Sequence, residues 1–146
     1  CTKAAALSVD ASPEEVEMAR LFGEYVGICF QIKDDIFDYY DSLEIGKPTG
    51  NDMREGKLTL PAIYALNSTQ DADAFRLAIK VKSGEVTGDE IARLIEYTKQ
   101  NGGIDYAKST MMAYKDRAKD LIADIKNIAV RDALFCYLDY VVNRVK

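Results

Sequence analysis

The chain contains no histidine among its 146 residues. Histidine is the commonest general base and zinc ligand in proteins, and it belongs to the usual catalytic triads. Any chemistry that this chain performs therefore proceeds without imidazole. Cysteine is also scarce, because Cys1, Cys29 and Cys136 lie far apart and form no C-x-x-C pair. This spacing predicts neither a disulfide framework nor a zinc site, and it favours a reducing, cytoplasmic environment.

Basic clusters and long apolar runs are missing as well. The net charge is -5 and the lysines and arginines are scattered, which argues against a nucleic-acid partner and against an anionic membrane surface. No apolar run reaches the length of a transmembrane helix, and no charged leader followed by an apolar core is typical of a signal peptide. The length and the content of 48% hydrophobic and 29% charged residues suit one soluble globular domain. Because the chain starts at Cys1 in a segment with helical character, we expect it to be part of a longer polypeptide.

A helical pattern runs along nearly the whole chain, with turn signals between segments and no convincing alternating strand. We therefore predict an all-α fold. Ser12, Pro13 and Glu15 form a capping box with proline at the first helical position, which predicts the start of a long helix. The expected organisation is the end of a truncated helix over 1–9, a motif-bearing helix over 12–40, a loop over 41–58 and supporting helices over 59–146. Within the last range we expect helices over 59–67, 71–81, 87–100, 104–126 and 131–145.

The long helix has apolar residues on more than one side, which is typical of a helix inside a bundle. Gly23 and Gly27 lie one turn apart on it. Both glycines would let a neighbouring helix approach closely, which is a packing role. These features favour a helical bundle.

Three carboxylates are crowded at the end of this helix. Asp34 and Asp38 lie one turn apart with Asp35 beside them, and neither Asp34 nor Asp38 has a lysine or arginine at its helical neighbour positions. Each like-charge pair costs about 0.2–0.5 kcal/mol, and the helix macrodipole disfavours negative charge at this end. A hard divalent cation would reverse the sign of this energy, so the cluster indicates Mg²⁺. Lys47 and Lys57 follow, as binding of a metal-bridged anion such as diphosphate would require.

Three sequence elements follow one another between Phe30 and Pro61, namely F-Q-x-x-D-D-x-x-D, G-K and D-x-x-x-G-K-x-T-L-P. Together they resemble the second aspartate-rich region of the trans-isoprenyl diphosphate synthases, the polyprenyl synthetase family. The resemblance implies an all-α helical bundle of the isoprenoid synthase type, of which this chain is the C-terminal part. It also implies a prenyltransferase that condenses an allylic prenyl diphosphate with isopentenyl diphosphate. The product is a longer linear trans-prenyl diphosphate, and ionisation of the allylic substrate is assisted by Mg²⁺.

The resemblance also implies roles for the charged residues. Asp34 would be a direct Mg²⁺ ligand, and Asp35 and Asp38 would hold the ion through water or through contacts behind the ligand. Lys47 and Lys57 would contact the allylic diphosphate, and the alternative for both is a solvated loop lysine. All five residues are expected to be catalytic.

Roles are also expected for other residues near these. Phe30 and Gln31 are expected to bind substrate, with a place in the core or within the helix as the alternative. Asp52 would orient the following lysine or bind metal-bound water, or it would only cap the loop. Tyr39 and Tyr40 are most simply packing residues.

The family pattern includes elements that this chain lacks, among them the first aspartate-rich region and the diphosphate-binding arginines. We therefore expect the chain alone to be inactive and the parent enzyme to be a homodimer. Two alternatives stay open, a terpene cyclase-like synthase of the same fold and a noncatalytic helical subunit of a heteromeric synthase. The G-K elements and the absence of an N-D-x-x-S-x-x-x-E cluster favour the elongating enzymes. A calcium-binding acidic domain is disfavoured because the spacing of an EF-hand loop is absent.

Overall fold

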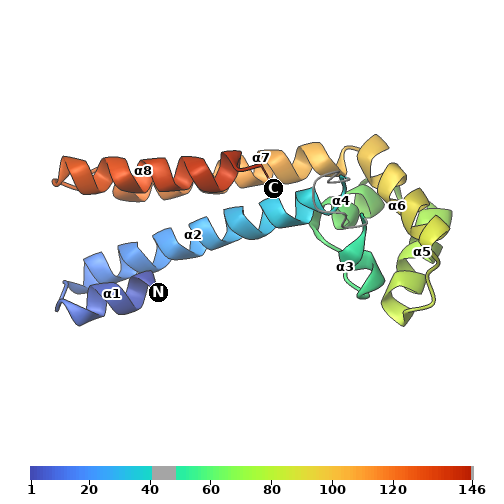
Figure 1. Ribbon diagram of the computed structural model, residues 1–146, viewed down its shortest axis with the longest axis horizontal. Helices are drawn as coiled ribbons and strands as arrows, with labels where there is room; N and C mark the ends of the chain where they lie inside the picture. Colours follow the sequence, from blue (N-terminus) through green and yellow to red (C-terminus); the bar gives the residue numbers. More distant parts are fainter. Residues whose placement is uncertain (41–48, 146) are drawn as a thin grey trace. The chain divides into compact units, whose positions relative to one another are not determined.

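The computed structural model describes residues 1–40 and 49–145, and within these ranges it contains eight α-helices and no strand (Figure 1). The predicted all-α fold is therefore confirmed. None of the described helices is both long and apolar enough to cross a membrane. The helices are α1 Thr2–Ser8, α2 Pro13–Phe37, α3 Asn51–Arg54, α4 Leu60–Thr69, α5 Ala72–Ser83, α6 Gly88–Gln100, α7 Gly103–Ile122 and α8 Ile128–Asn143.

The chain divides into two compact units. Unit 1 comprises Cys1–Lys33 and Thr110–Val145, and unit 2 comprises Asp34–Ser109. Unit 1 contains α1, α8 and most of α2, whereas unit 2 contains α3 to α6 and the last residues of α2. Helix α7 begins in unit 2 and ends in unit 1.

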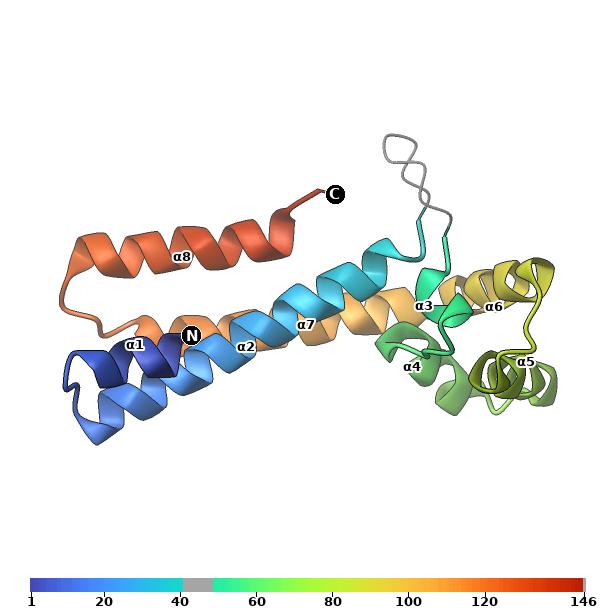
Figure 2. The same ribbon diagram turned by 60° about the horizontal axis from the view of Figure 1, so that its bottom comes forward.

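In unit 1, α1 lies beside the first part of α2 (Figure 2). The predicted capping box at the start of α2 is confirmed, since the Ser12 amide donates to the Glu15 carboxylate at 2.8 Å and the Glu15 amide donates to Ser12 Oγ at 3.3 Å. A Cβ atom on Gly23 would collide with the side chain of Thr2 in α1, so the predicted close approach is confirmed there. It is wrong for Gly27, where a Cβ atom would meet no described atom within 4 Å.

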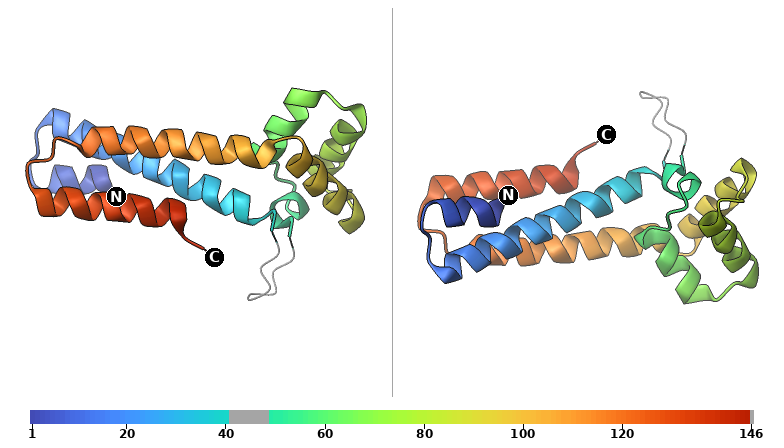
Figure 3. Two further views of the ribbon diagram at one scale, coloured as in Figure 1. Left: turned by 90° about the horizontal axis from the view of Figure 1, so that it is seen from above. Right: turned by 90° about the horizontal axis from the view of Figure 1, so that it is seen from below.

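Helix α8 runs antiparallel to the unit 1 part of α7 (Figure 3). An ion pair of 2.6 Å between Lys115 Nζ of α7 and Asp139 Oδ1 of α8 joins the two helices. On the α2 side of α7, the thiol of the buried Cys29 donates to the carbonyl of Met111 at 3.4 Å. Helix α7 is therefore held by polar contacts to both α2 and α8.

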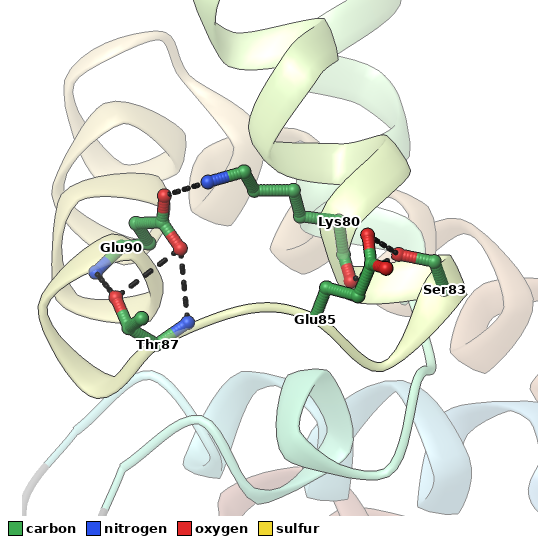
Figure 4. Close-up of polar contacts among 5 residues, drawn as sticks. All are labelled: Lys80, Ser83, Glu85, Thr87 and Glu90. Carbon is green, nitrogen blue, oxygen red and sulfur yellow. Dashed lines mark hydrogen bonds and ion pairs between the residues drawn. The ribbon is translucent and has the colours of Figure 1, made fainter.

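In unit 2, α5 and α6 are joined by a short turn with a network of polar contacts (Figure 4). The capping box of α6 is present, because the Thr87 amide donates to the Glu90 carboxylate at 2.9 Å and the Glu90 amide donates to Thr87 Oγ1 at 3.3 Å. Lys80 of α5 forms an ion pair with the same carboxylate. At the end of α5, Ser83 Oγ donates to the Glu85 carboxylate at 3.1 Å. The predicted start of the helix over 87–100 is therefore confirmed in α6.

Three boundaries differ from those expected. Helix α2 ends at Phe37 rather than near 40, and α7 ends at Ile122 rather than near 126. Helix α8 begins three residues earlier than expected, because Asn127 caps it by accepting the Val130 amide at 3.2 Å. Helix α3 lies inside the range expected to be a loop. The other predicted helices are found within two residues of their expected ends.

Candidate active site

The three predicted aspartates lie at the end of α2. Asp34 and Asp35 belong to its last turn, and Asp38 follows the last helical residue. Asp35 is buried, whereas Asp34 and Asp38 are half-buried. The last turn of α2 contains no basic residue, so these carboxylates stand at the negative end of the helix dipole without a cation from that turn.

Asp38 caps the start of α3. Its Oδ1 accepts the Asn51 amide at 3.0 Å, its Oδ2 accepts the Asp52 amide at 3.0 Å, and its main-chain carbonyl accepts the Gly50 amide at 2.9 Å. The first amides of a helix have no partner inside it. Because the N-cap residue Gly50 supplies no side-chain hydrogen bond, Asp38 provides these partners from 13 and 14 residues away.

The position of Gly50 requires glycine for two reasons. Its φ is +77°, in the left-handed region that favours glycine. A Cβ atom there would lie 2.5 Å from Cγ2 of Ile91 and 3.0 Å from Cδ1 of Ile95, both in α6. The start of α3 is therefore held closely against α6.

The end of α3 explains the second G-K pair of the sequence. Gly56 has a φ of +77°, its amide donates to the Met53 carbonyl at 3.1 Å, and the Lys57 amide donates to the Asp52 carbonyl at 2.8 Å. These two bonds and the left-handed glycine form a Schellman motif, which ends the helix. Lys57 leaves this turn with an exposed side chain whose Nζ lies 2.6 Å from Glu55 Oε2. The hydrogen bond to Glu55 raises the pKa of Lys57.

Asp52 lies near the carboxylates of Asp35 and Asp38 at the end of α2. Partial burial raises its pKa first, and the nearby charges of Asp38 and Asp35 raise it further. The main chains of Asp52 and Lys57 are joined by the amide-to-carbonyl hydrogen bond, and the role predicted for the Asp52 side chain stays a prediction. A cation beside these carboxylates would relieve the repulsion among them.

Carboxylate oxygens are the ligands that Mg²⁺ prefers. In the part of the chain that the structure describes, no three histidine, cysteine, aspartate or glutamate side chains form a group that could hold a metal ion. Mg²⁺ usually keeps several waters and is bound through one or two carboxylates and the phosphates of a substrate. The carboxylates at the end of α2 fit this kind of site.

The remaining predicted residues are found in different surroundings. Phe30 and Gln31 belong to the part of α2 in unit 1 and are exposed. Phe30 lines a pocket of about 460 Å³ formed by α1, α2 and α8. The guanidinium of Arg144 lies 4.0 Å from the centre of the Phe30 ring and donates to the Phe30 carbonyl at 3.2 Å. No motif in the sequence indicated this contact of Arg144. The predicted site residue Lys47 lies outside the described residues.

The two tyrosines after α2 differ in exposure. Tyr39 is buried, and burial raises its pKa to about 12. This agrees with the packing role predicted for it. Tyr40 is half-exposed, and the ammonium group of Lys99 in α6 lies 4.9 Å from its ring centre.

The sequence profile of the polyprenyl synthetase family matches residues 1–98. This chain belongs to the polyprenyl synthetase family. It is 34% identical to the short chain isoprenyl diphosphate synthase of Methanothermobacter thermautotrophicus over 98% of this chain and 44% of that protein. It is 36% identical to the nonaprenyl diphosphate synthase of Mycobacterium tuberculosis over 92% of this chain and 40% of that protein.

Solved structures of polyprenyl synthetases have the same fold. The geranylgeranyl pyrophosphate synthase of Bacteroides thetaiotaomicron is 64% identical, with a TM-score of 0.94 over 99% of this chain and 48% of that one. The polyprenyl synthase of Caulobacter crescentus, solved with calcium and isoprenyl diphosphate, is 30% identical, with a TM-score of 0.83 over 97% of this chain and 44% of that one. This chain thus spans about half the length of the relatives that it matches.

The predicted family and fold class are confirmed by these likenesses. The matched residues 1–98 include the aspartate-rich end of α2. The roles of Phe30, Gln31, Asp34 and the other site residues stay predictions.

Proposed function

We propose that this chain forms the part of a prenyltransferase that binds Mg²⁺ and the allylic diphosphate. The whole enzyme would condense an allylic prenyl diphosphate with isopentenyl diphosphate to a longer linear trans-prenyl diphosphate. The observation that carries the proposal is the acidic end of α2, to which α3 brings a further carboxylate and the exposed Lys57. Relatives at 34% and 36% identity that are named as prenyl diphosphate synthases support it.

The chemical demand of this reaction is the separation of a diphosphate anion from an allylic carbocation. Bound Mg²⁺ would supply positive charge that stabilises the departing diphosphate. Asp34 would hold the ion directly. Asp35 and Asp38 would support the ion through water molecules or through contacts with the residue that binds it. The end of α2 would hold these carboxylates in place before the reaction, and such preorganisation is the condition for electrostatic stabilisation of a transition state.

The lysines would bind the diphosphate oxygens as point charges. Lys57 is paired with the exposed Glu55, and an exposed ion pair of this kind contributes little to stability. A diphosphate carries more negative charge than one carboxylate, so Lys57 would exchange partners at little cost. We assign Lys47 the same role.

Phe30 and Gln31 are proposed to bind substrate. Phe30 already lines a pocket, and we propose that its ring faces the prenyl chain. Gln31 lies one turn before both Asp34 and Asp35 on α2, where its amide would orient a carboxylate.

The whole enzyme is proposed to be a homodimer in the reducing cytoplasm, which suits three cysteines that are all unpaired. The residues of this chain alone are proposed to be inactive, since the relatives extend well beyond the matched part. One observation favours a heteromeric enzyme instead. Two relatives, from Geobacillus stearothermophilus and Bacillus subtilis, are named heptaprenyl diphosphate synthase component 2, at 35% and 31% identity.

Product analysis tests the proposal. The full-length protein is incubated with an allylic diphosphate and Mg²⁺, with and without isopentenyl diphosphate. We expect a longer prenyl diphosphate only when isopentenyl diphosphate is present. Consumption of the allylic substrate alone would indicate a cyclase-like synthase. A protein that turns over neither mixture but restores activity to another synthase would be a noncatalytic subunit.

A further inference from the structure

We propose that Asp38 is a positioning residue, which caps α3 and thereby places Asp52 and Lys57 beside the acidic end of α2. This inference rests on the proposed function, because it concerns how the same diphosphate site is assembled. It separates the role of Asp38 from that of Asp34, although both belong to the same aspartate-rich segment.

Both oxygens of the Asp38 carboxylate are directed at α3. Oδ1 accepts the Asn51 amide and Oδ2 accepts the Asp52 amide, each at 3.0 Å, and the Asp38 carbonyl accepts the Gly50 amide at 2.9 Å. Three consecutive amides thus donate to one residue. Hydrogen bonds to a charged acceptor are stronger than those between neutral groups.

Helix α3 depends on partners outside itself. It has four residues, and isolated helices much longer than this are already marginal in water. Its start is held by Asp38 and by the close packing of Gly50 on Ile91 and Ile95. Loss of the Asp38 cap therefore removes one of the contacts that hold the start of α3.

The cap is connected to Lys57 through the main chain. The Asp52 amide donates to Asp38, and the Asp52 carbonyl accepts the Lys57 amide at 2.8 Å. The same cap holds the Asp52 carboxylate near Asp35 and Asp38 against electrostatic repulsion, and this repulsion contributes to its raised pKa. Asp38 thus acts on both a carboxylate and an ammonium group without touching the substrate.

A comparison of Asp38→Ala, Asp38→Asn and Asp34→Ala tests this role in the full-length protein. Two quantities are measured, the hydrogen exchange of the Asn51 and Asp52 amides and the affinity for inorganic diphosphate in the presence of Mg²⁺. Asparagine is as good an N-cap as aspartate but keeps one acceptor oxygen and no charge. If Asp38 acts as a cap, Asp38→Asn should therefore keep part of the amide protection and diphosphate affinity that Asp38→Ala loses. If Asp38 acts as a charged metal ligand, Asp38→Asn should lose as much affinity as Asp38→Ala.

In Asp38→Ala we expect both amides to exchange about tenfold faster or more, as the loss of a charge-assisted hydrogen bond implies. Diphosphate affinity should fall about 10- to 100-fold, the range found when a residue supporting a metal ligand is removed. Asp38→Asn should keep at least one amide protected and recover most of the affinity. Asp34→Ala should abolish Mg²⁺-dependent binding and leave both amides protected.

Three results would overturn the inference. The first is unchanged amide exchange in Asp38→Ala, and the second is faster exchange with unchanged diphosphate affinity. The third is a loss of affinity in Asp38→Asn as large as in Asp38→Ala. If Asp38→Ala does not fold, Asp38→Asn and Asp34→Ala still decide between a cap and a ligand. Failure of the unaltered protein to bind Mg²⁺ and diphosphate would instead refute the proposed function, and amide exchange would still test the cap.

Discussion

Replacement of Gly50 by alanine tests how α3 is held against α6. An alanine at the left-handed φ of +77° costs about 1–2 kcal/mol. Its methyl group would lie 2.5 Å from Ile91 Cγ2 and 3.0 Å from Ile95 Cδ1, and forcing extra volume into a packed interior costs about 1–3 kcal/mol more. We therefore expect Gly50→Ala to lower the free energy of unfolding by about 2–5 kcal/mol.

Gly84 provides a matched control. It has a φ of +75° at the end of α5, and a Cβ atom there would meet no described atom within 4 Å. Gly84→Ala should therefore cost only the conformational part, about 1–2 kcal/mol. Urea denaturation of both variants measures the two losses, with m-values compared to exclude changes in the unfolded state. Equal losses in the two variants would refute the claim that α3 is packed tightly on α6 through Gly50.

Three further predictions concern charged groups. Ion pairing with Lys80 lowers the pKa of Glu90 from 4.5 to about 2, so its stabilisation is full above pH 4.5 and is lost as the pH falls toward 2. Between pH 4.5 and pH 2, the midpoint of urea unfolding should therefore depend less on pH in Glu90→Gln than in the unaltered protein. Asp139→Asn should destabilise the protein by about 1–3 kcal/mol in thermal or urea unfolding, because the nearly buried Lys115 loses its partner. Lys57→Gln should weaken diphosphate binding about tenfold or more in calorimetry while the unfolding midpoint stays unchanged, since the side chain is exposed. The first expectation would be contradicted if Glu90→Gln had the same pH dependence as the unaltered protein. Unchanged stability in Asp139→Asn would contradict the second, and unchanged diphosphate affinity in Lys57→Gln would contradict the third.

Features encoded by neighbouring residues could be predicted from the sequence. The capping boxes at Ser12 and Thr87 lie within three residues of their partners, so both helix starts were predicted correctly. The position of Asp34 and Asp35 in the last turn of α2, with Asp38 directly after it, also follows from their spacing in the sequence. Such local patterns needed no knowledge of the rest of the fold.

Features that depend on distant residues could not be predicted in the same way. Helix α3 was missed because Asp38 supplies its cap from 13 and 14 residues away. The packing of Gly50 on α6 and the contact of Arg144 with Phe30 likewise join residues far apart in the sequence. The close approach predicted at Gly27 failed for the same reason, because glycine spacing does not reveal where the neighbouring helix lies.

The central claim is that the acidic end of α2 binds Mg²⁺ together with a prenyl diphosphate. Isothermal titration calorimetry of the full-length protein with an allylic diphosphate, with and without Mg²⁺, tests it most directly. We expect binding that requires Mg²⁺ and is lost in Asp34→Ala, while the circular dichroism of the variant is unchanged. Equal binding of the allylic diphosphate to the unaltered protein and to Asp34→Ala would contradict the claim.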